Sequence, residues 1–112
     1  MKENILTKTA IEYFLEGNEA LSRERYNSAA VLFFKALVGF SDLYIFKKTG
    51  QIPSSHSNRF SLAKLKFPEV YDLLDKDFPF YQDSYTKIIS KELAEVIKND
   101  AQDMAKKVGI EV

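Results

Sequence analysis

The side chains of this chain best suited to chemistry are a histidine, an arginine and a group of tyrosines. The single histidine, His56, lies three residues before Arg59 near the start of a short predicted helix. A later segment carries Tyr81, Asp83 and Tyr85. If the two segments face each other across a cleft, the tyrosine rings could stack on a base, while Arg59 and the free amides of a helix N-terminus hold a phosphate. These five residues are a candidate nucleotide-binding site, with no catalytic role assigned.

A purely structural interpretation of the polar residues stays open. His56 could be a loop or capping residue that hydrogen-bonds the short helix, and the tyrosines could fill the edges of the core. Lys35 and Asp42 could form a buried charge pair. They lie seven residues apart, however, in line with Ser28 on one face of a helix. We expect these three side chains to form a narrow stripe exposed to water.

The composition excludes several classes of site. The chain has no cysteine and one histidine, so disulfides and a thiolate nucleophile are excluded, and we predict no metal site and no cofactor. Sixteen basic and sixteen acidic residues give no net charge, which argues against broad, charge-driven binding of nucleic acid. The paired lysines at 47–48 and 106–107 lie at predicted helix C-termini, where cations are favoured in any case.

No targeting or membrane segment is expected. The first fourteen residues mix acids with short apolar groups and do not resemble a secretory signal. The longest apolar run, Ala29 to Phe34, is far shorter than a membrane span. We expect one cytoplasmic, soluble domain over residues 1–112.

The stretch from Tyr26 to Lys48 is the element around which we expect the chain to fold. A helix here would be apolar around most of its circumference, so other helices or a second copy of the chain must cover it. Gly39 and Ala36 would let another backbone approach closely. Asn27 or Ser28 could cap its start. Gly50 could end it in the left-handed conformation.

Amphipathic helices are predicted on both sides of the central one. The first runs from about Asn4 to Arg23, antiparallel to the central helix, and Gly17 marks a kink or a close contact within it. Short helices follow the loop after Gly50, one from Ser57 or Asn58 to Lys66 and one opened by Pro68. A further helix is predicted to start at Pro79 with Asp77 as its cap.

The last helix is predicted to be capped by Ser90 and to end at Gly109. No stretch alternates as a half-buried strand does. The predicted fold is therefore all-α, an antiparallel up-and-down bundle of four to five helices. Nine Phe and six Tyr are many for so small an interior. We therefore expect a homodimer with the central and first helices in its interface, the other possibility being a tightly packed monomer.

Three features together resemble the HEPN domain family, the nucleotide-binding domain of higher eukaryotes and prokaryotes. They are the segment RYNSAAVLFFKAL, the P-x-x-H loop at Pro53 to His56, and FYQDSY before an Ala-rich last helix. The resemblance spans roughly residues 10 to 108. It implies a bundle that usually dimerises, in a family that includes ribonuclease toxins and companions of small nucleotidyltransferases in toxin–antitoxin pairs.

The ribonuclease members carry an Arg followed four to six residues later by a His, a pair suited to phosphate stabilisation and proton transfer. No Arg precedes His56 at that spacing, and Ser84 stands where relatives often carry an Arg. We therefore expect a non-catalytic module that binds a nucleotide or a small nucleotidyltransferase partner, with a ribonuclease toxin lacking the usual motif as one alternative. The segment ERYNSAAVLFFKAL also resembles a tetratricopeptide helix, and a protein-interaction module is the other alternative.

Overall fold

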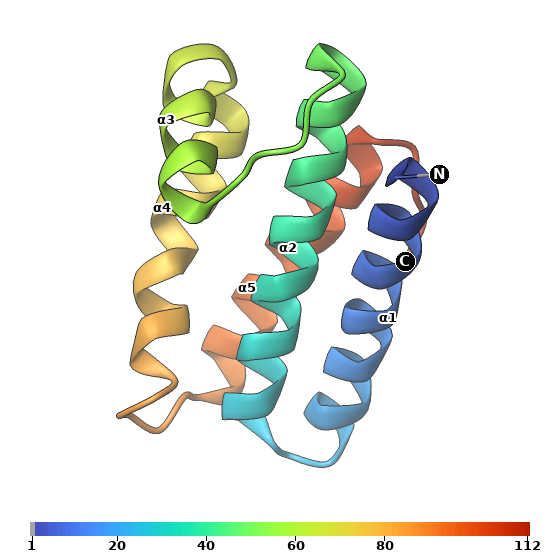
Figure 1. The fold of residues 1–112 in the computed structure, drawn as a ribbon. Helices are drawn as coiled ribbons and strands as arrows, with labels where there is room; N and C mark the ends of the chain where they lie inside the picture. Colours follow the sequence, from blue (N-terminus) through green and yellow to red (C-terminus); the bar gives the residue numbers. More distant parts are fainter. Residues whose placement is uncertain (1) are drawn as a thin grey trace.

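The computed structural model describes residues 2–112, and these form five helices and no strand (Figure 1). The helices are α1 (Lys2–Ser22), α2 (Tyr26–Thr49), α3 (His56–Lys66), α4 (Pro68–Asp83) and α5 (Lys91–Lys107). In Figure 1, α1, α2, α4 and α5 run alternately down and up, while α3 forms a hairpin with α4 at one end of the bundle. The predicted all-α bundle is confirmed.

Helix α2 lies at the centre of the bundle and contacts α1, α4 and α5. The aromatic side chains of Phe33, Phe34 and Phe40 on α2 are fully buried. By length and hydropathy alone, α2 could cross a membrane, but 61% of its apolar window is buried inside the bundle. The expectation that other parts of the molecule cover this helix is confirmed.

Two glycines set the distance between α1 and α2. A Cβ atom built on Gly39 would lie 2.8 Å from the Cβ of Ala10, and one on Gly17 would lie 2.7 Å from the ring of Phe33. Both distances are too short for real atoms, so the two backbones approach this closely only because neither position carries a side chain. The close contacts expected at Gly17 and Gly39 are confirmed.

The predicted ends of α2 and α5 and the cap of α5 are confirmed, but the start of α2 differs, and α3 begins at His56 after a Ser55 cap rather than at Ser57 or Asn58. Ser90 accepts a hydrogen bond from the amide of Leu93, and Gly50 and Gly109 adopt the left-handed conformation. No side chain caps α2. Asn27 instead binds the α4–α5 loop: its Nδ2 donates to the carbonyl oxygens of Ser84 at 2.9 Å and Lys87 at 2.7 Å, and its Oδ1 accepts from the amide of Ile89 at 2.9 Å. The cap predicted from Asn27 or Ser28 is therefore wrong.

The prediction of a separate helix at Pro79 is also wrong. Pro79 lies inside α4, which continues from Pro68 to Asp83. Proline cannot donate to the carbonyl four residues earlier, but that residue, Asp75, is exposed, so water can bind its carbonyl. The apolar side of α4 has Phe78 before the proline and Tyr81 after it, and both rings pack against Phe34 on α2, which keeps the helix intact.

Asp77, predicted as a cap, is instead buried between α4 and α5. Asp77 is 0% exposed, and neither of its carboxyl oxygens has a hydrogen-bond partner. The acidic group nearby is Asp100 on α5, whose Oδ2 lies 2.8 Å from the amino group of Lys76. Burial, together with Asp100, raises the pKa of Asp77 to about 8. Asp77 therefore holds its proton at neutral pH.

Candidate functional site

The predicted site residues partly converge on a groove along α2, between α1 and α4. A pocket of about 210 Å³ lies there, and we call it the α1–α4 groove. It is lined by Tyr13, Phe34, Lys35, Val38, Gly39, His56 and Tyr81. Four helices contribute to it, α1 by Tyr13, α3 by His56, α4 by Tyr81 and α2 by the remaining residues.

Aromatic rings form one wall of the groove. Tyr81 stacks on Phe34 with ring centroids 4.7 Å apart and planes 20° apart. Phe78 lies beside both rings, at 6.0 Å from Phe34 and 6.2 Å from Tyr81. The His56 ring lies 5.8 Å from Phe78. Because these rings are packed against one another, the half-buried face of Tyr81 is held in a fixed orientation at the groove.

His56 is held by two buried charges behind it. Arg59 donates from Nε to Oδ1 of Asp42 at 2.6 Å and from Nη2 to Oδ2 at 2.8 Å. Its Nη1 lies 3.0 Å from Nδ1 of His56. Asp42 is 6% exposed and Arg59 8%. The exposed position predicted for Asp42 from its spacing with Lys35 is therefore wrong. An arginine from α3 covers Asp42.

The other predicted residues lie farther along α4 and beyond its end. The hydroxyl groups of Tyr81 and Tyr85 form a hydrogen bond of 2.9 Å, but Tyr85 lines a neighbouring pocket together with Asn27. Asp83 forms an ion pair with Lys87 at 3.4 Å and does not line the α1–α4 groove. The structure therefore brings His56 and Tyr81 into one pocket, with Arg59 behind His56, and leaves Asp83 and Tyr85 outside it.

Five of the seven lining residues were not among the predicted site residues, and Tyr13 and Lys35 are the polar ones. The amino group of Lys35 lies 5.9 Å from the ring centroid of Tyr13, and both side chains line the groove. Lys35 is exposed, as predicted, and it brings a positive charge to the rim. The position of Lys35 four residues before Gly39 on α2 could have suggested that it lies at the groove. Its neighbour Tyr13 on α1 could not be predicted, because that contact depends on how the two helices pack.

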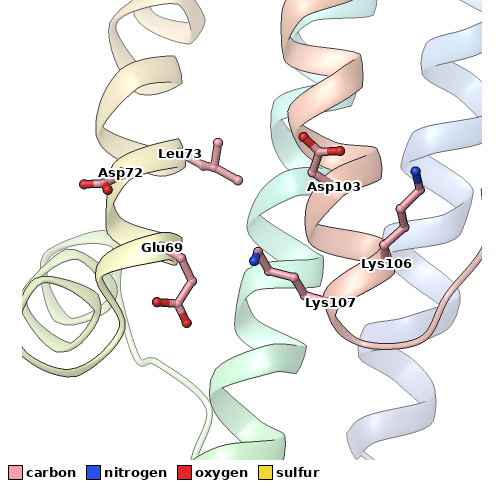
Figure 2. Close-up of a pocket in the computed structure, with 6 residues that line it drawn as sticks. All are labelled: Glu69, Asp72, Leu73, Asp103, Lys106 and Lys107. Atoms are coloured by element: carbon pink, nitrogen blue, oxygen red, sulfur yellow. The ribbon is translucent and has the colours of Figure 1, made fainter.

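A larger hollow, of about 620 Å³, lies between α4 and α5. Figure 2 shows Lys107 directed across the gap towards α4, whereas Asp72 and Lys106 point away from it. Glu69 accepts a 2.6 Å hydrogen bond from the hydroxyl group of Tyr44, which lowers the pKa of Glu69. The hollow has no aromatic lining residue and carries both signs of charge, so it offers no surface on which a base could stack.

The α1–α4 groove combines a ring face, a positive charge at the rim and a histidine nitrogen. This set can stack on a flat ring, attract an anion and form one directional hydrogen bond. Comparisons of the chain with family models, with curated proteins and with solved structures found no match. The chemistry of the groove is therefore the basis for assigning a function.

Proposed function

We propose that this protein is a non-catalytic, HEPN-like module that binds a nucleotide in the α1–α4 groove. The observation that carries the proposal is the stacked pair of Tyr81 and Phe34 in the same pocket as Lys35. Aromatic faces bind bases of any sequence, and a lysine at the rim can neutralise a phosphate. The resemblance in the sequence supports the same class of ligand.

The size of the groove limits the ligand. Its volume of about 210 Å³ is below the roughly 300–1,000 Å³ of pockets that enclose drug-sized molecules. A single base fits such a volume, while the ribose and the phosphate lie outside it, towards Lys35. The proposal therefore concerns a mononucleotide whose base is enclosed and whose phosphate is exposed to solvent.

Calorimetric titration with AMP, GMP, CMP and UMP, and with the four matching nucleosides, tests the proposal. We expect Lys35→Ala to weaken binding of the nucleotides by up to about fivefold, as for an exposed ion pair, and to leave nucleoside binding unchanged. Lys106→Ala, on the α4–α5 hollow, is the matched control and should change neither. Absence of binding by all eight compounds, or equal effects of the two lysine variants, would contradict the proposal.

Docking on a protein partner is a second candidate, favoured by apolar side chains where α4 ends. Tyr85 is 71% exposed and Ile88 96%, and exposed apolar groups of this size often mark protein contacts. The resemblance to the HEPN family indicates the kind of partner to expect, which is a small nucleotidyltransferase or a second copy of this chain. Co-purification should recover the partner with the native chain and lose it with Ile88→Ser. Leu65→Ser, at a site on α3 that is 78% exposed, should retain it.

A repeat module has less support. The hairpin of α1 and α2 is built from helices of 21 and 24 residues, whereas α3 and α4 have 11 and 16. Residues 2–112 therefore contain no second, equivalent hairpin on which the first could stack.

A further inference from the structure

The hydrogen bond between Arg59 and His56 determines which nitrogen of the imidazole carries the proton. A guanidinium group has only donors and stays protonated in proteins. At 3.0 Å from Nη1 of Arg59, Nδ1 of His56 must therefore act as the acceptor. The proton of the neutral ring then lies on Nε2, at the opposite side of the imidazole.

Arg59 cannot turn away from this contact without a large cost. Two of its other N–H groups bind both oxygens of the buried Asp42, and such a two-point pair fixes the plane of the guanidinium. Breaking it would leave a carboxylate buried without its partner. The plane of Arg59, and with it the direction of its bond to His56, is therefore set by Asp42 on α2.

We infer that Asp42 and Arg59 are positioning residues that hold His56 as a neutral imidazole with its proton on Nε2, so that His56 donates a hydrogen bond to an acceptor atom of the bound base. The inference rests on the proposed function for the identity of the ligand. It adds a prediction about which edge of the base faces His56. That edge carries a ring nitrogen or a carbonyl oxygen as the acceptor, because an amino group there would place its own N–H against the N–H of His56.

The electrostatic surroundings of His56 favour the neutral ring. Burial lowers the pKa of His56, and the positive charges of Arg59 and Lys35 lower it further, while Asp42 acts in the opposite direction. The ring of Phe78, 5.8 Å from the His56 ring, carries no charge. His56 is therefore neutral at pH 7, and its protonation state should not change between pH 7 and 8.

Nitrogen-15 NMR of the imidazole in the intact chain tests the positioning role directly. His56 is the single histidine, so its two ring nitrogens give the only signals of this kind. We expect an unprotonated Nδ1 and a protonated Nε2 at pH 7.5 without ligand. In the double variant Asp42→Leu/Arg59→Met, which replaces the buried pair by apolar groups, we expect a mixture of both tautomers and a pKa closer to the ordinary value.

A wild-type spectrum with the proton on Nδ1, or the same mixture in both proteins, would overturn the positioning role.

The donor role is tested by binding of the tightest mononucleotide to His56→Phe and His56→Gln. Loss of one hydrogen bond should weaken binding to His56→Phe by roughly 2- to 10-fold, and the amide of His56→Gln should restore most of it. Equal affinity of both variants and the native chain would overturn the donor role. A correct tautomer without any nucleotide binding would reject the proposed function and leave the positioning of His56 intact.

Discussion

Arg59 and Asp42 form a buried, two-point ion pair between the first turn of α3 and the middle of α2, with bonds of 2.6 and 2.8 Å. The pair lies directly behind His56, and it ties the short α3–α4 hairpin to the central helix. A single contact between two charged residues therefore supports both the position of a helix and the orientation of a candidate ligand-binding side chain.

Removing one partner of this pair should destabilise the protein strongly. Arg59→Ala leaves the Asp42 carboxylate buried without compensation, and we expect a loss of about 3–5 kcal/mol in the free energy of unfolding. The double variant Asp42→Leu/Arg59→Met should differ from the native protein by less than half of that loss, because no buried charge is left alone. Urea denaturation measures both. A double variant as unstable as Arg59→Ala would contradict this explanation.

Asn27 should stabilise the α4–α5 loop by its three hydrogen bonds. We expect Asn27→Ala to lower the free energy of unfolding by about 1–3 kcal/mol, since each bond contributes roughly 0.5–1.5 kcal/mol and water replaces part of them. Hydrogen exchange at the amide of Ile89, which donates to Asn27, should become faster. Ser28→Ala, at the exposed neighbouring position, is the control, and a comparable effect there would argue against a specific role for Asn27.

The buried Asp77 should make stability depend on pH. Its pKa rises from 3.8 to about 8 on folding, so between these values the folded state holds a proton that the unfolded chain lacks. The stabilising contribution of Asp77 therefore falls as pH rises, by roughly 1.4 kcal/mol per unit, and becomes constant above pH 8. The stability of Asp77→Asn relative to the native protein should rise across this window.

Denaturation midpoints of the two proteins, measured between pH 4.5 and 9, test whether folded Asp77 holds a proton. Asp75→Asn, an exposed change on the same helix, should follow the native protein at every pH. A difference between Asp77→Asn and the native protein that does not vary with pH would exclude a proton held by Asp77 in the folded state.

Gly39→Ala should separate α1 from α2. The added methyl group would lie 2.8 Å from the Cβ of Ala10, which cannot move without its backbone. We expect a net loss of about 1–2 kcal/mol, because the cost of overpacking exceeds the gain in helix propensity. The double variant Gly39→Ala/Ala10→Gly, measured by thermal denaturation, should recover part of the loss. Failure to recover any of it would show that the contact with Ala10 is not the cause.

The helices could be predicted from the sequence because local patterns determine them. The apolar circumference of α2, the caps at Ser90 and Gly109, and the small residues at Gly17 and Gly39 are all visible in short stretches of sequence. The sequence predicts a helix start at Pro79 because proline usually starts a helix, and only the packing of Phe78 and Tyr81 against α2 explains why α4 continues through it.

The candidate site could be predicted only in part. His56 and Tyr81 were named because their side chains suit nucleotide binding, and they do line one groove. The sequence could not predict that Tyr13 lines the groove or that Asp42 pairs with Arg59. Both contacts depend on how α1 and α3 pack against α2. The spacing of Lys35 and Asp42 placed them on one face of the helix, but it could not indicate that α3 covers Asp42.

The central claim, that a nucleotide binds in the α1–α4 groove, is tested most directly by titrating isotope-labelled protein with AMP and with UMP and following the amide and aromatic NMR signals. Binding in the groove should give saturable shifts at Tyr13, Lys35, Gly39, His56 and Tyr81, while Lys106 and Lys107 remain unchanged. Shifts confined to the α4–α5 hollow, or no shifts with either nucleotide, would contradict it.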